Sequence, residues 1–227
     1  MQDLMLVHGA IGSSKQLRGL EESLKDLYRV HNPDLPAHGG QPMVDQFSIS
    51  FFADHIIQYC DEHKIDKFSI FGYSMGGYIA LYLARHYPAR VEKVVTLATK
   101  FHWDPMIAQK EIQMLQPGLI KEKLPKFALD LSERHAPNDW GELLQKTAGM
   151  LERLGQQNEL NTEDHKEIKQ PVLVMLGDRD KMVGLDETVA VYKLLNNAQL
   201  AILPGTPHPI EQVNTELLSF FIRKFIG

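Results

Sequence analysis

Short apolar runs alternate along most of this chain with longer stretches of helical periodicity. Six runs have the length and composition of buried strands, at residues 3–9, 28–34, 67–74, 91–99, 171–178 and 197–205. Between them, helices are expected at residues 14–24, 48–63, 75–86, 185–195 and 210–225. Strands joined by helices pair in parallel through right-handed crossovers. The pattern therefore predicts an α/β fold with three layers, a doubly wound and mostly parallel sheet of about six strands.

The length and composition of the chain indicate a single domain of ordinary size. The chain has 227 residues, of which 44% are hydrophobic and 23% charged, as in folded globular proteins. Its net charge of −5 argues against a nucleic-acid partner and against attraction to anionic membranes. The first residues lack the pattern of a signal peptide, and no apolar stretch has the length of a membrane span. Cys60 is the only cysteine, so an internal disulfide is excluded and we expect a cytoplasmic protein.

Residues 101–168 interrupt the alternation, because they contain no run that reads as a strand. Helix-forming residues dominate the segment, and Pro117, Pro125 and Pro137 divide it. Its apolar side chains need a surface to cover. We therefore expect an all-helical cap, inserted into a core that residues 1–100 and 169–227 form.

The hexapeptide GYSMGG, residues 72–77, lies where the third expected strand gives way to a helix. It contains the pattern G-x-S-x-G, which at such a junction favours a serine nucleophile over a purely structural turn. A serine that projects from this turn adopts a strained backbone, so its neighbours must be small, as Gly72, Gly76 and Gly77 are. The helix that follows also directs free N–H groups at the same point. Ser74 is therefore the candidate nucleophile.

A serine hydroxyl needs a base to take its proton near neutral pH. Among the ten histidines, His208 directly follows the sixth strand, at the sheet edge where catalytic groups gather. Asp178 and Asp180 both follow the fifth strand, and either carboxylate could orient the histidine. No histidine or third carboxylate accompanies them at ligand spacing, so no metal site is predicted. Six other histidines are interpreted as solvated or packing residues: His55, His63, His86, His102, His135 and His165.

The order serine, aspartate, histidine is typical of the α/β-hydrolase fold superfamily, which nearly the whole chain resembles. The resemblance rests on the segments LVHGAIGSS, DLPAHGGQ, GYSMGG, LGDRDKMV and GTPHPIEQ. It implies that the acid is Asp180, the last residue of a G-x-x-D segment, and that the backbone N–H groups of Ala10 and Met75 form an oxyanion hole. It also implies structural roles for His8 and His38, and no metal or organic cofactor.

These features predict a serine hydrolase that cleaves a small carboxylic ester, thioester or related acyl bond through an acyl-enzyme intermediate. Phe101, Trp103 and Met106, at the start of the cap, are candidates for an apolar pocket that binds a neutral acyl group. Two alternatives stay open: a lyase or carbon–carbon bond hydrolase that uses the same triad, and a non-catalytic small-molecule receptor. The expected partner is a small acyl substrate, and self-association is also open.

Overall fold

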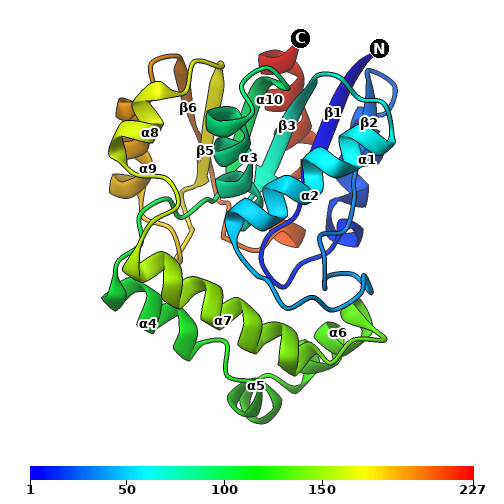
Figure 1. Cartoon of the computed structure of the whole chain (residues 1–227), viewed down its shortest axis with the longest axis vertical. Helices are drawn as coiled ribbons and strands as arrows, with labels where there is room; N and C mark the ends of the chain where they lie inside the picture. Colours follow the sequence, from blue (N-terminus) through cyan, green and yellow to red (C-terminus); the bar gives the residue numbers. More distant parts are fainter.

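The computed structural model describes all 227 residues and contains one sheet of six strands, with every neighbouring pair parallel. Across the sheet the order is β2-β1-β3-β4-β5-β6 (Figure 1). The strands are β1 Gln2–Val7, β2 Tyr28–His31, β3 Phe68–Tyr73, β4 Val91–Leu97, β5 Val172–Gly177 and β6 Ala198–Leu203. Each overlaps a run that the sequence predicts to be a strand. The α/β class and the parallel sheet are confirmed.

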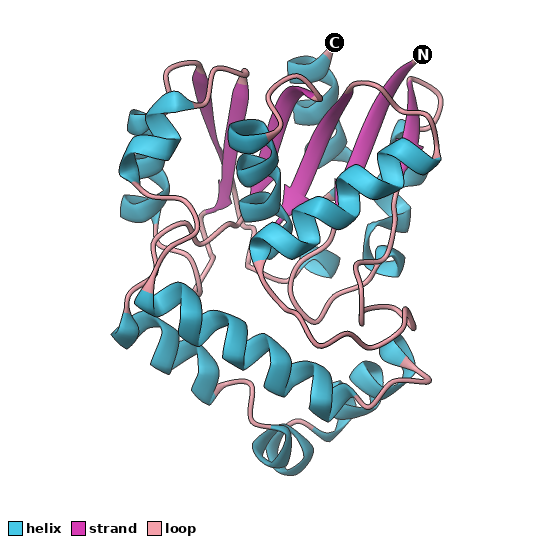
Figure 2. Ribbon diagram, in the orientation of Figure 1, coloured by secondary structure: helices cyan, strands magenta, loops and turns pink.

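Successive residues of a strand point to opposite faces of the sheet, and here they build two separate cores. Met5 and Val7 of β1 belong to one core, whereas Leu4 and Leu6 belong to the other. Helices cover both faces, which gives the three layers (Figure 2). The first face carries α2 Ile49–Glu62, α3 Met75–His86 and α9 Leu185–Leu194, and the second carries α1 Arg18–Leu24 and α10 Thr215–Ile226.

Two helices begin later than the hydrophobic pattern predicts. In place of a helix from residue 210, Ile210–Gln212 form a short 3₁₀ turn, and α10 starts only at Thr215. The reason is local, because the Asn214 side chain accepts a hydrogen bond from the Leu217 N–H at 2.9 Å and caps the helix there. Ser14–Leu17 likewise form a 3₁₀ turn ahead of α1.

Four helices lie across the carboxyl ends of the strands and form the cap (Figure 1). They are α4 Pro105–Gln113, α5 Pro117–Lys123, α6 Pro125–His135 and α7 Trp140–Gln156. Three of the four begin with a proline, which fits the first turn of a helix because its nitrogen needs no acceptor there. The last helix of the expected insertion, α8 Thr162–Glu167, packs instead against α3 and α9, beside the sheet.

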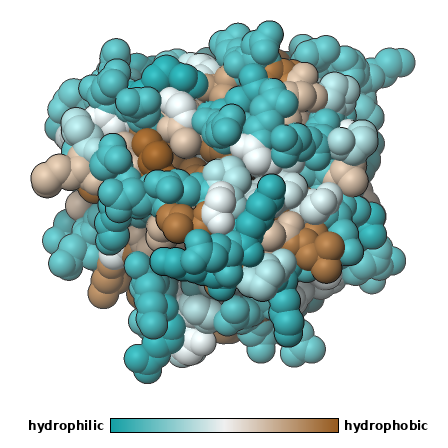
Figure 3. Space-filling view, turned by 90° about the horizontal axis from the view of Figure 1, so that it is seen from below, coloured by the Kyte–Doolittle hydropathy of each residue, from teal (hydrophilic) through white to brown (hydrophobic).

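The face of the molecule on the side of the cap is mostly hydrophilic, with apolar side chains in separate spots (Figure 3). The large apolar residues of the cap that remain exposed are Met106, Met114, Leu119, Leu124 and Leu129. No helix combines the length and the apolar composition that crossing a membrane requires.

Candidate active site

Ser74 lies on the tight turn between β3 and α3. Its backbone has φ 52° and ψ −117°, a region that residues with a side chain rarely adopt. The turn is held by a hydrogen bond of 2.8 Å from the Ser74 N–H to the carbonyl of Leu97 in β4. Close packing explains the neighbouring glycine, because a Cβ on Gly76 would lie 2.2 Å from the Val7 carbonyl oxygen. The sheet therefore fixes a strained serine at its carboxyl edge.

Asp180 and His208 are joined by a hydrogen bond. The Nδ1–H of His208 donates to Oδ2 of Asp180 at 2.8 Å, and the Asp180 side chain is only 1% exposed. The other carboxylate oxygen accepts hydrogen bonds from the backbone N–H groups of Met182 and Val183. Burial alone would raise the pKa of Asp180, but the hydrogen bonds from His208 and Val183 outweigh it and hold the pKa below its usual value.

Asp178, the other carboxylate that the sequence left open, does not reach His208. Its Oδ1 accepts a hydrogen bond of 3.2 Å from the Thr206 N–H, and its side chain is 36% exposed. Asp178 thus holds together the turns that follow β5 and β6.

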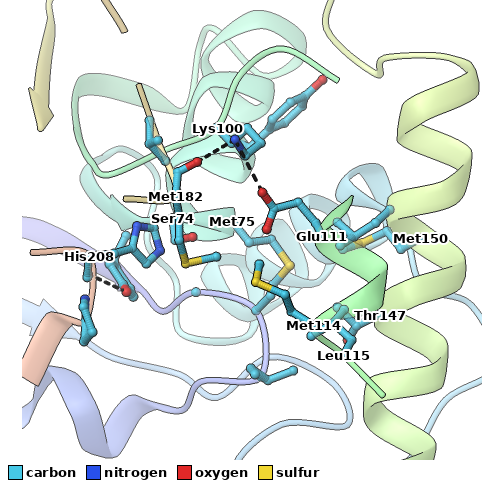
Figure 4. A pocket seen from close by; sticks show the side chains of 18 of the residues that line it. Ser74, Met75, Lys100, Glu111, Met114, Leu115, Thr147, Met150, Met182 and His208 are labelled. Carbon is cyan, nitrogen blue, oxygen red and sulfur yellow. Dashed lines mark hydrogen bonds and ion pairs between the residues drawn. The ribbon is translucent and has the colours of Figure 1, made fainter. Parts of the chain in front are cut away.

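Ser74 and His208 line one cavity of about 400 Å³ between the cap and the sheet. The imidazole of His208 lies beside the Ser74 side chain (Figure 4). The hydrogen bond of the ring is with Asp180 and none joins it to the Ser74 hydroxyl, a contact that often tightens only when substrate binds. Ala10 and Met75 line the same cavity, and the Met75 N–H, the first of α3, has no acceptor within the helix. No group of three or more His, Cys, Asp or Glu side chains is placed to hold a metal ion.

Of the three residues predicted to line a substrate pocket, the structure places only Trp103 at the cavity. Phe101 is 2% exposed and packs edge-on against the His165 ring, away from the cavity. Met106 is 80% exposed, because it lies on the outward side of α4. The predictions for Phe101 and Met106 are therefore wrong. The apolar lining comes from other cap residues, namely Met114, Leu115, Ile120, Leu124, Phe127, Met150, Leu151 and Leu154.

The end of α6 holds the loop that contains Ala10. The Nε2–H of His135 donates a hydrogen bond to the Ile11 carbonyl at 2.9 Å, and Arg134 donates another to the same oxygen at 3.1 Å. The Nδ1 atom of His135 accepts a hydrogen bond from the Gly39 N–H at 3.1 Å, so the ring is neutral with its proton on Nε2. Burial lowers the pKa of His135 to about 4. The sequence gives no signal for this contact, because 124 positions separate its partners.

A second buried histidine holds the same loop from the sheet side. The Nδ1–H of His8 donates to the Gly9 carbonyl at 2.8 Å, and its Nε2 accepts from the Leu35 N–H at 3.1 Å. The His38 ring lies against both His8 and His135, at 5.1 and 5.8 Å between ring centres. Burial lowers the pKa of His8 and that of His38. These rings are packed, neutral parts of the structure that surrounds the loop.

Comparison with known proteins agrees with this arrangement. The family described as the alpha/beta hydrolase fold matches residues 4–159. The chain belongs to the alpha/beta hydrolase fold family. This membership confirms the resemblance that the sequence motifs suggested.

Three individual proteins illustrate what this chain is similar to. A pimeloyl-[acyl-carrier protein] methyl ester esterase of Aeromonas hydrophila is 29% identical over 151 residues, which are 60% of this chain and 57% of the relative. A thermophilic esterase from Thermogutta terrifontis has a TM-score of 0.80 at 21% identity, with 100% of this chain and 89% of that chain covered. A meta-cleavage product hydrolase from Pseudomonas fluorescens has a TM-score of 0.80 at 22% identity, with 100% and 90% covered.

The coverage of the curated relatives is partial. The chain spans somewhat over half the length of the Aeromonas esterase and as little as 35% of another curated relative. The two solved structures, at these identities, show the shared fold alone.

Proposed function

We propose that this alpha/beta hydrolase is a serine esterase that cleaves small carboxylic esters, thioesters or related acyl bonds in the cytoplasm. One observation carries the proposal: Oδ2 of Asp180 lies 2.8 Å from Nδ1 of His208, and His208 lines the same cavity as Ser74. This hydrogen bond fixes the proton of the ring on Nδ1 and leaves Nε2 free to accept the Ser74 proton. The name of the Aeromonas relative, an ester-cleaving enzyme, supports the same reaction class.

The proposed reaction has two halves. Ser74 Oγ attacks the acyl carbon as His208 Nε2 takes its proton, and the leaving alcohol or thiol then receives that proton. The backbone N–H groups of Ala10 and Met75 stabilise the negative oxygen of the tetrahedral intermediate. Water, activated by the same imidazole, releases the acid. Seventeen of the 27 residues that line the cavity are hydrophobic, which suits an acyl chain.

A fluorophosphonate probe followed by peptide mass spectrometry tests this proposal. We expect one adduct, on Ser74, and nitrophenyl acetate or butyrate turnover that Ser74→Ala lowers by about a millionfold. Absence of the adduct would instead support a non-catalytic receptor. An adduct together with turnover of β-diketones but not of esters would support carbon–carbon bond hydrolysis.

A further inference from the structure

Two charged side chains interrupt the apolar lining of the cavity. Glu111, on α4 of the cap, and Lys100, directly after β4, both line it, and Figure 4 shows them facing each other across the space above Met75. Glu111 is 6% exposed as a residue, and the Lys100 side chain is 15% exposed. Neither side chain takes part in the proposed acyl transfer.

Glu111 lacks the hydrogen bonds that a buried carboxylate normally has. The nearest cation, Lys100 Nζ, is 3.7 Å from Glu111 Oε1, beyond hydrogen-bond distance, and no other protein group donates to the carboxylate. Lys100 Nζ donates instead to the Met182 carbonyl at 2.7 Å. The Glu111 oxygens are not among the fully buried side-chain atoms without a partner, so they are open to the cavity, and a donor for them has to come from inside it.

The charges that line the cavity balance. Lys100 faces Glu111, and Arg134 lies 3.5 Å from Glu211 at another part of the lining. Outside the lining, Glu187 Oε1 also lies 3.7 Å from Lys100 Nζ, so two carboxylates share this one cation. A ligand group with a full negative charge would be repelled here, and one with a full positive charge would compete with Lys100 for Glu111. A neutral ligand group that can hydrogen-bond fits this lining best.

We propose that Glu111 and Lys100 form a subsite for a neutral substrate group that both donates and accepts hydrogen bonds, a hydroxyl or a carboxamide. The 3.7 Å between Nζ and Oε1 lets the oxygen of a hydroxyl lie within hydrogen-bond distance of both atoms, whereas a carboxamide would use its N–H toward Glu111 and its oxygen toward Lys100. The group donates to Glu111 and accepts from Lys100. The substrate is then an ester with a hydroxyl or carboxamide some distance from the acyl carbon. This inference rests on the proposed esterase function and narrows it.

A series of esters tests the subsite. Nitrophenyl esters of ω-hydroxy acids are compared with alkanoate esters in which a methyl group replaces the hydroxyl, at each chain length. We expect kcat/KM to favour the hydroxy ester by roughly tenfold or more at one length, where the hydroxyl reaches Glu111, because a hydrogen bond to a charged group is strong. An alkanoate preference at every length would overturn the proposal.

Variants of Glu111 and Glu187 test whether Glu111 recognises the substrate or only forms a structural ion pair with Lys100. Glu111→Leu should abolish the hydroxy preference, measured as the ratio of kcat/KM for the two esters in the same protein, and Glu111→Gln should reduce this ratio several-fold without changing the shape of the site. Glu187→Gln is the matched control, because Glu187 Oε1 is also 3.7 Å from Lys100 Nζ but does not line the cavity. Glu187→Gln should leave the preference intact. Equal losses for both esters in the Glu111 and Glu187 variants would show a structural role only.

Binding to the Ser74→Ala protein separates failure of the subsite from failure of the esterase proposal. Titration calorimetry with the intact hydroxy and alkanoate methyl esters requires no turnover. Tighter binding of the hydroxy ester, lost in the Ser74→Ala/Glu111→Leu protein, supports the subsite even if the reaction is not ester cleavage. Equal binding of the two esters, together with Ser74-dependent turnover in the wild type, refutes the subsite and leaves the esterase proposal standing.

Discussion

The Nε2–H of His135, at the end of a cap helix, donates a hydrogen bond to the carbonyl of Ile11, next to the candidate oxyanion donor Ala10. Ile11 has a φ of 52°, so the loop is held in a conformation that a β-branched residue rarely adopts. The Gly39 N–H donates to the other nitrogen of the same ring. One neutral histidine thus ties the cap, the loop of Ala10 and the loop of Gly39 together.

Substitution of His135 by glutamine and by asparagine should therefore have different effects on kcat. Glutamine can place an N–H where Nε2 lies and donate to Ile11, whereas asparagine can replace only Nδ1 and accept from Gly39. We expect His135→Gln to keep kcat within a few-fold of wild type and His135→Asn to lower it roughly ten- to a hundredfold, because the oxyanion donors shift. The affinity of a boronic acid inhibitor should fall in the same variant as kcat does. Equal kcat in the two variants, both shown to be folded by thermal melting, would contradict this role.

The buried histidines should make the protein less stable in mild acid. Burial lowers the pKa of His135 to about 4 from 6.5, so between these values the unfolded chain binds a proton that the folded chain does not. The free energy of unfolding should then fall as the pH drops below 6.5, by about 1.4 kcal/mol per pH unit for this one group. Burial lowers the pKa of His8 and His38 in the same direction.

Urea denaturation at several pH values between 7 and 4.5 measures this dependence. His135→Gln removes one of the titrating groups. The slope of its unfolding free energy against pH should therefore be smaller than that of the wild type, by the amount that about one bound proton contributes. A slope that is unchanged in His135→Gln would show that the ring takes up its proton at the same pH in the folded and the unfolded chain.

The two carboxylates after β5 should have unequal effects on catalysis. Asp180→Asn should lower kcat by about ten-thousandfold, because asparagine no longer favours the tautomer with the proton on Nδ1 of His208. Asp178→Asn is the matched control, since its carboxylate accepts from the Thr206 N–H and does not contact His208. Assay of both purified variants with one nitrophenyl ester checks the ranking, and the reverse order would mean that Asp178 orients the base.

The lining of the cavity should decide which acyl chains fit. Each buried methylene contributes about 0.8 kcal/mol, so kcat/KM should climb several-fold per carbon until the cavity of about 400 Å³ is full. Trp103→Ala enlarges the cavity and should move the optimum to longer chains. Met106→Ala is the control, because Met106 is 80% exposed and outside the cavity, and its profile should match the wild type. A profile that Trp103→Ala leaves unchanged would exclude the tryptophan from the acyl site.

The amino-acid sequence alone determined the parts of this protein that depend on neighbouring residues. The runs around β3 and β5 are rich in apolar residues, as in strands that helices cover on both faces, and every residue of both strands is buried. The glycines around Ser74 and the order of Ser74, Asp180 and His208 also stand in the sequence, and they place the candidate nucleophile and base at one edge of a parallel sheet. Local capping by Asn214 was the exception, and it shifted the start of α10.

Only the tertiary structure decided which cap residues face the cavity and which side chains hold its loops. Met106 and Glu111 belong to the same helix, yet one is exposed and the other buried, because the packing of α4 against α7 sets the rotation of the helix. The contact between His135 and Ile11 joins segments 124 positions apart, and the contact between Glu111 and Lys100 joins the cap to the sheet. Such pairs leave no periodic trace in a sequence, since they depend on how separate elements dock.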